Sequence, residues 1–214
     1  MNRRVGARIV WFSLALVVLA SCSRAQQKAS SYDGHWWLSI SENEQSGFLN
    51  GYFDCYYYEF KGPARFSYPV DLYQLEITKF FRMDESNLST PVSEVLLDYR
   101  DSRGFKIIDK YAEHAKGPHG YYDGLYWRQI SEYTGPELEQ LGFVEGYLAC
   151  HAGLNHNKGG VFSKPPAEYV RLITQWYGFN RKTDDVDAKR EPAAIAEALF
   201  KFRDQPQDSP PGNK

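Results

Sequence analysis

The chain has 214 residues and a formal net charge of −2, from 25 Lys and Arg residues against 27 Asp and Glu residues. A mildly acidic chain without a basic stripe lacks the positive footprint of proteins that bind phosphate backbones, so we expect no nucleic-acid partner. Aromatic residues make up 16 % of the sequence. Such residues serve either as rigid core or as the lining of sugar- and protein-binding surfaces.

The first residues carry the pattern of an export signal. Arginines and no acids occur in residues 1–8, and residues 9–20 form an apolar run broken by one serine. A membrane-spanning helix needs about 20 apolar residues, so this run is too short to span a bilayer durably. Its length and flanks suit a signal peptide. We therefore expect residues 1–21 to be removed on export.

The apolar run ends in the sequence Leu-Ala-Ser-Cys22, a lipobox pattern in which the cysteine receives diacylglycerol before cleavage. Ordinary cleavage after Ala25 is the alternative. An aspartate after the cysteine would signal retention in the inner membrane, but Ser23 stands there. We therefore expect a lipoprotein on the periplasmic side of the cell envelope, held by a lipid on Cys22 and favouring the outer membrane. Residues 23–31 are small and polar, as suits a flexible tether, which we predict over residues 22–32.

The rest of the sequence contains one motif twice. Asp-Gly-His-Trp-Trp recurs as Asp-Gly-Leu-Tyr-Trp, and two longer segments recur with similar spacing. Insertions fall between the matched segments and not within them, which indicates a duplicated structural unit. The matched segments are 33–37 with 123–127, 44–55 with 139–150, and 69–81 with 165–177.

This repetition predicts the domain organisation. We expect a mostly α fold, a helical bundle made of two pseudo-symmetric copies of a three- to four-helix unit. The predicted copies are residues 33–101 and 123–204, with a connector over 102–122 that is rich in Gly, Lys and His. Residues 205–214 contain three prolines and are predicted to be disordered.

Local signals place the helices within each copy. Ser41 and Glu44 form a capping box that opens a helix whose apolar residues cover more than half of its circumference, as in a helix buried on most sides. Prolines begin the next helix, at Pro69 and at Pro165. A third helix is predicted after Pro91 in the first copy and after Pro192 in the second.

Both long helices carry small residues at spacings i, i+4 and i+8. Glycine within a helix costs about 1 kcal/mol relative to alanine. Its occurrence at matching places in both copies indicates close approach of another backbone. The rows are Gly47, Gly51 and Cys55 in the first copy, and Gly142, Gly146 and Cys150 in the second.

The cysteines form an even pair if Cys22 is lipidated. Cys55 and Cys150 then remain in a compartment that permits disulfides. They can pair if the two long helices lie with their cysteine ends together, and they are too far apart if the helices run antiparallel. The sequence leaves both alternatives open, a disulfide or two buried free thiols.

No familiar catalytic motif occurs in the sequence. It lacks a nucleophile elbow, a Ser-x-x-Lys pair, a glycine-rich phosphate loop and a His-Glu-x-x-His zinc motif. Cys150, His151 and His156 do not share one helical face and lack further ligands nearby, so no metal site is expected. His35 stands beside two tryptophans, and a leucine replaces it in the second copy, which favours packing. We expect no cofactor and no catalytic residue.

The segment Gly-Phe-Leu-Asn-Gly-Tyr-Phe-Asp at residues 47–54 resembles the signature of the Tai/Rap group. These are periplasmic immunity proteins that neutralise type VI secretion amidase effectors. Gln74-Leu75 and Pro91-Val92-Ser93 occupy places comparable to the family's later helices. The resemblance implies an all-α bundle that acts by binding a protein, without catalysis.

Three function classes follow as expectations. The first is a non-enzymatic envelope lipoprotein that binds another protein, such as a secreted hydrolase that it inhibits. The second is a glycan- or peptidoglycan-binding lipoprotein that uses exposed aromatics at Trp36, Trp37, Tyr126 and Trp127. The third is a hydrolase built on His35 or His151 with nearby glutamates, for which no complete catalytic set can be assembled.

Overall fold

The structure is a computed structural model, and it describes residues 32–60, 66, 69–100, 122–132, 136–154, 162–179 and 187–204. The predicted signal peptide, Cys22, the tether before residue 32, the connector before residue 122 and the tail after residue 204 lie outside the described residues. The chain divides into two compact units, Met1–Tyr32 and Asp33–Lys214, and all of the helices below belong to the second.

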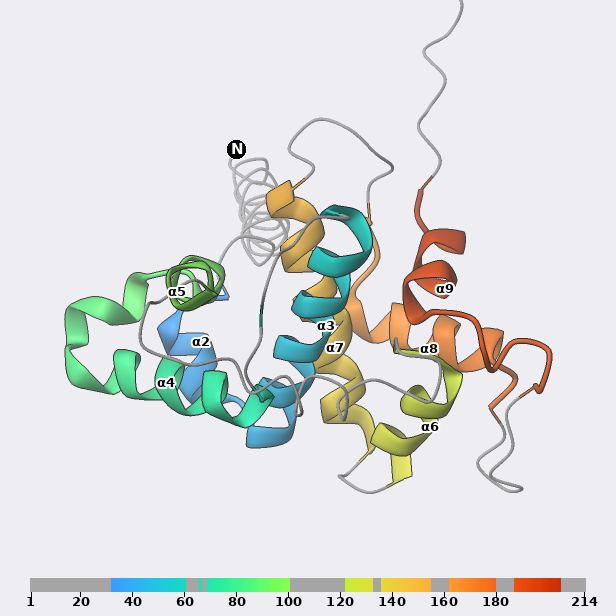
Figure 1. The fold of residues 1–214 in the computed structure, drawn as a ribbon, viewed down its shortest axis with the longest axis horizontal. Coiled ribbons are helices and arrows are strands. Elements are labelled where there is room, and N and C mark those ends of the chain that lie inside the picture. The colour runs from blue at the N-terminus through green and yellow to red at the C-terminus, as the bar shows by residue number, and fades with distance from the viewer. Residues whose placement is uncertain are drawn as a thin grey trace, which may run out of the picture. The chain divides into compact units, whose positions relative to one another are not determined.

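The described part of this unit is mostly helical (Figure 1), which confirms the predicted mostly α class. Extended pairing among the described residues is limited to two isolated antiparallel bridges, Asp33–Pro91 and Asp123–Ala194. Of the helices described, none is long and apolar enough to cross a membrane. The elements are α2 (Gly34–Ser39), α3 (Glu42–Phe60), α4 (Val70–Met83), the 3₁₀ helix η1 (Glu85–Ser89), α5 (Val92–Arg100), α6 (Gly124–Glu132), α7 (Pro136–Leu154), α8 (Pro166–Trp176) and α9 (Ile195–Lys201).

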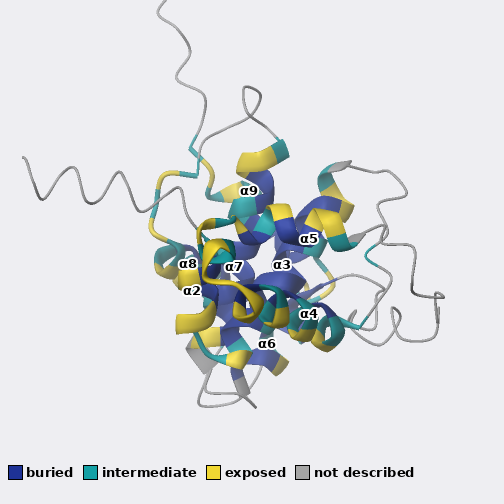
Figure 2. Cartoon of the chain, turned by 90° about the vertical axis from the view of Figure 1, so that its left-hand side faces the viewer, coloured by how far each residue is buried: buried dark blue, intermediate teal, exposed yellow. Residues whose placement is uncertain are grey.

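Helices α3 and α7 lie side by side at the centre of the unit (Figure 1). They run in the same direction, because Gly47 near the start of α3 faces Glu139 near the start of α7, while Cys55 meets Cys150 further along. Most of their residues are buried, as Figure 2 shows. Helices α2, α4 and α5 lie on one side of this pair, and α6, α8 and α9 lie on the other (Figure 1). We call these groups, with α3 and α7 respectively, the first half and the second half.

Three polar contacts fix α2 in the first half. The Asp33 carboxylate caps the helix by accepting a hydrogen bond from the backbone N–H of Trp36 at 3.0 Å. The Trp37 indole N–H donates to Thr78 Oγ1 on α4 at 2.9 Å. The Gln45 amide on α3 donates to the carbonyl oxygen of Trp37 at 2.7 Å. Together they hold α2 against both α4 and α3.

The same three contacts occur around α6 in the second half. The Asp123 carboxylate accepts from the backbone N–H of Tyr126 at 3.0 Å. The Trp127 indole N–H donates to Thr174 Oγ1 on α8 at 3.1 Å. The Gln140 amide on α7 donates to the carbonyl oxygen of Trp127 at 3.0 Å. The residues involved are those that the sequence repetition pairs with the first half.

Helices α4 and α8 each begin after a proline with nearly the same backbone conformation, Pro69 with φ −55° and Pro165 with φ −56°. Each buries one apolar stripe toward the central pair and leaves the opposite face exposed. The buried stripes are Tyr73, Ile77 and Phe81 on α4, and Tyr169, Ile173 and the following Tyr177 on α8.

Candidate functional site

The centre of the molecule is a close crossing of two helices, which we call the glycine seam. Each of its four glycines faces the backbone of the other helix, in the pairs Gly47–Glu139, Gly51–Phe143, Gly142–Glu44 and Gly146–Phe48. A Cβ atom at Gly51 would lie 2.9 Å from the Cα atom of Phe143 and closer still to its carbonyl oxygen. Such an approach is not tolerated against backbone, so the glycines are what lets the helices lie this close.

A disulfide between Cys55 and Cys150 closes the far end of the seam. The two Cα atoms are 6.1 Å apart, and both residues are buried. Of the two alternatives that the sequence leaves open, the structure contains the disulfide, because α3 and α7 run parallel with their cysteine ends together. The bond joins the first half covalently to the second.

A histidine and a glutamate meet beside this disulfide. His151 Nδ1 on α7 lies 2.7 Å from Glu59 Oε1 on α3, and the two side chains are only 11 % and 12 % exposed. The same carboxylate oxygen is 3.7 Å from Cys55 Sγ. The ring of Phe162 meets the imidazole edge-on, with centroids 4.8 Å apart. The sequence indicated His151 but not Glu59, because the two residues are 92 positions apart and no motif links them.

A second buried polar contact joins the halves nearer the middle of the seam. Asn50 Nδ2 on α3 donates to the hydroxyl oxygen of Tyr126 at 2.8 Å, and the Tyr122 hydroxyl donates to Asn50 Oδ1 at 2.8 Å. Burial raises the pKa of Tyr122 well above its usual value, and the charges of Asp54 and Glu139 add to this effect. The pKa of Tyr126 is raised in the same way, chiefly by burial. Both hydroxyls therefore keep their protons across the physiological range.

The aromatic residues that the sequence suggested as a glycan platform belong mainly to the core. Trp37 and Trp127 are fully buried with their indole N–H groups engaged, and Tyr126 is buried against Asn50. Trp36 is half-buried, with its ring 5.1 Å from that of Phe48. Three of the four side chains therefore offer no open face for a sugar ring to stack on.

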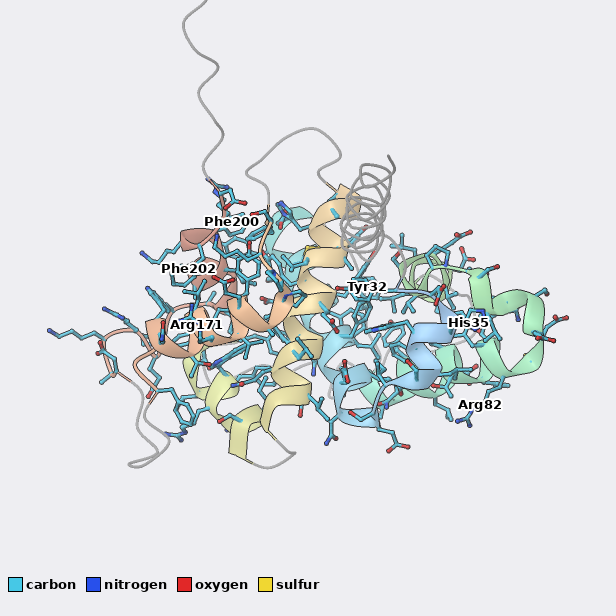
Figure 3. All side chains as sticks on the ribbon, turned by 180° about the vertical axis from the view of Figure 1, so that it is seen from behind. Tyr32, His35, Arg82, Arg171, Phe200 and Phe202 are labelled. Carbon is cyan, nitrogen blue, oxygen red and sulfur yellow. A yellow bond between two sulfur atoms is a disulfide. The ribbon has the colours of Figure 1, made fainter. Side chains whose placement is uncertain are left out.

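Exposed large apolar side chains occur mostly in the first half. Among the described residues of the second half, Leu138 is the one exposed large apolar side chain. Leu75 on α4 is 61 % exposed, and the matching position on α8 is Arg171, whose side chain is 57 % exposed. Figure 3 places Arg171 and Phe200 on one side of the molecule, with His35 and Arg82 on the other. The exposed apolar residues of the first half are Leu38, Tyr57, Tyr58, Leu75, Met83 and Leu97.

Within the described ranges, no three or more His, Cys, Asp or Glu side chains lie close enough together to hold a metal ion. His35 is exposed on α2, and His151 is engaged with Glu59. The sites that the structure brings together are thus the glycine seam, the disulfide and the two buried polar contacts between the halves.

Comparisons of the chain with protein-family models, with curated proteins and with solved structures find no significant match.

Proposed function

We propose that the protein is a non-enzymatic lipoprotein of the cell envelope that recognises another protein through its first half. The observation that carries the proposal is the exposure of Leu75 and Met83 on α4, at 61 % and 74 %. Contiguous exposed apolar side chains mark protein-binding surfaces, and methionine is enriched in them. Arg171 at the place of Leu75 in the second half sets the two outer faces apart chemically.

The rigidity of this face follows from what lies behind it. Thr78 on α4 accepts the indole N–H of Trp37 at 2.9 Å, and Gln74 donates to Gln45 on α3 at 2.9 Å. The central pair is in turn cross-linked by the disulfide. A surface held in this way loses little conformational entropy on binding, which favours affinity.

We propose further that the exported body consists of two copies of one helical unit related by a pseudo-two-fold axis along the central pair. The contacts around α2 and α6 support this, since cap, indole and amide bonds recur at paired positions. Reciprocal contacts at the seam support it too, since Gly51 faces Phe143 and Gly146 faces Phe48. In this arrangement the outer face of α4 carries Leu75 at the place where the outer face of α8 carries Arg171.

Site-specific photocross-linking in the native envelope tests the binding proposal. A photoreactive amino acid replaces Leu75 in the full-length lipidated protein, and the matched control carries it at Arg171. We expect one discrete cross-linked protein from position 75 and none from position 171. Equal adducts from positions 75 and 171, or no adduct from position 75, would contradict the proposal.

The partner that we propose is a secreted hydrolase, on the basis of the resemblance of residues 47–54 to the immunity-protein signature. The cross-linked protein should then hydrolyse an envelope substrate, and adding the purified lipoprotein should lower its rate. The Leu75→Arg variant, which copies the second half at this position, should inhibit much less. A cross-linked partner without hydrolase activity would leave protein binding in place and refute the inhibitor role.

A further inference from the structure

The glycine seam by itself does not specify which helix pairs with which. Helices α3 and α7 carry the same row of two glycines and a cysteine at the same spacing, and each glycine faces backbone. Both helices therefore present the same kind of surface at the seam, which consists of glycines and backbone. By shape alone, an α3 helix would therefore fit against a second α3 as well as against α7.

The first difference between the halves lies at Asn50. Its amide needs both an acceptor and a donor, and the second half supplies them through the hydroxyls of Tyr126 and Tyr122 at 2.8 Å. At the place of Tyr126 the first half has Trp36, whose indole offers no oxygen acceptor. A pair of two first halves would therefore leave the buried amide group of Asn50 short of an acceptor.

The second difference lies beside the disulfide. Glu59 meets His151 at 2.7 Å in a site where both side chains are largely buried. The sequence positions that match these residues hold Leu154 in the second half and Tyr56 in the first. A pair of first halves would bury the Glu59 carboxylate without an imidazole. A pair of second halves would set His151 against leucine.

We propose that these two buried polar contacts are the specificity determinants that make the first half pair with the second half and not with a copy of itself. The proposal rests on the two-copy organisation and is independent of what the outer surface binds. Buried polar groups that lose their partners are costly, so mismatched pairs are penalised even where the helices fit. The partner that the seam fits is therefore a helical unit carrying Tyr126 and His151; Tyr122 does not discriminate, because Tyr32 holds the matching place in the first half. This selection would protect a duplicated chain from exchanging halves with its neighbours.

The disulfide supplies a direct readout of pairing. In the full-length protein a protease site is inserted within residues 102–121 and cut after folding, so that both halves remain present. The nicked protein is then equilibrated in a glutathione redox buffer, in which disulfides exchange. Peptide mapping distinguishes Cys55–Cys150 bonds from Cys55–Cys55 and Cys150–Cys150 bonds. We expect nearly all bonds in the wild type to join Cys55 to Cys150.

Two variants erase the proposed determinants by giving each position the residue of the other half. One combines Glu59→Leu with His151→Tyr, and the other is Tyr126→Trp. In the first variant we expect the share of Cys55–Cys150 bonds to fall toward roughly one half, which is the share that unselective pairing gives. In the second variant we expect a smaller fall in this share. The matched control exchanges exposed residues, Lys79→Gln with Gln175→Lys, and should pair as the wild type does.

Exclusive Cys55–Cys150 bonding in both variants would overturn the proposal, and so would like-with-like bonds in the nicked wild type. Circular dichroism accompanies each map. If both variants lose their helical signal, the residues hold the fold and do not select the partner, which also overturns the proposal. None of these outcomes depends on the cross-linking result from position 75.

Discussion

At Gly51 and Gly146 the volume of a side chain is occupied by the backbone of the neighbouring helix. We predict that Gly51→Ala and Gly146→Ala each destabilise the protein by about 1–3 kcal/mol, the usual cost of overpacking, despite alanine's better helix propensity. Gly153 on α7 is the matched control, since a Cβ atom there would meet nothing within 4 Å. Urea unfolding measures all three variants.

Gly153→Ala should be neutral or slightly stabilising, because a helical glycine gains from the change where space is open. Equal losses at Gly51 and Gly153 would mean that helix propensity and not close packing decides both. A gain at Gly51 would contradict the seam as described.

The residues of the centre were predictable in unequal degree. The glycine rows and the two cysteines stand out in the sequence because they occur twice at the same spacing. The Glu59–His151 contact does not stand out in the sequence. The first half has Tyr56 where the second has His151, so a comparison of the two copies does not reveal the pair. Asn50 is likewise matched by Glu145, and its partners Tyr122 and Tyr126 lie more than 70 positions away.

At the scale of elements, the indole bonds of Trp37 and Trp127 tie α2 to α4 and α6 to α8. We predict that Thr78→Val and Thr174→Val each cost about 1–3 kcal/mol, because an isosteric change leaves a buried indole N–H without an acceptor. Thermal unfolding should give similar losses for both, as equivalent positions require. Thr90→Val, in the turn before α5, is the control and should stay near wild type. Clearly unequal losses at the two threonines would count against the two-copy organisation.

The segment that follows α9 is held to the residues before α8 by the Asp204 carboxylate, and this contact depends on pH. Hydrogen bonds from Ser163 and Lys164 lower the pKa of Asp204 below its usual value. A lowered carboxyl pKa in the folded state stabilises the protein above the ordinary aspartate range, about pH 4, and this contribution is lost as the pH falls through the folded-state value. Asp204→Asn should therefore lower the melting temperature at pH 7 and make little difference at pH 2–3. A difference in melting temperature between Asp204→Asn and wild type that stays the same from pH 7 to pH 2–3 would refute this account.

The start of the third helix shows where local signals fail. Pro192 predicts a helix start, but α9 begins at Ile195 and residues 191–193 form a turn. The Ile195 N–H donates to the carbonyl oxygen of Tyr122 at 2.9 Å, and Ala194 forms a bridge with Asp123. A contact with a residue some 70 positions away sets the boundary, and no local pattern records it.

At the scale of the whole molecule, the helical class followed from periodicity and capping, whereas the parallel direction of α3 and α7 did not. Direction depends on contacts between residues far apart in the chain, such as Gly47 with Glu139, which local sequence does not encode.

The export prediction concerns residues 1–22 and is tested by experiment. Cys22→Ser should abolish labelling by a palmitate analogue and release the protein from membranes. A wild-type protein that takes up no label would contradict lipidation, and the alternative cleavage after Ala25 would then account for export.

The disulfide joins two halves that already meet along the glycine seam. Its sequence separation of 95 residues predicts a stabilisation of up to about 4.7 kcal/mol in the chain-entropy model, because the cross-link restricts the unfolded chain. We predict that the double change Cys55→Ala with Cys150→Ala lowers the free energy of unfolding by up to this amount while the protein still folds, since the seam glycines and both buried polar contacts are retained. Urea unfolding of the variant should match that of reduced wild type. Cys22→Ser is the control, and it should leave the free energy of unfolding of the oxidised protein unchanged. Complete unfolding of the variant without denaturant would mean that the seam alone cannot hold the two halves together.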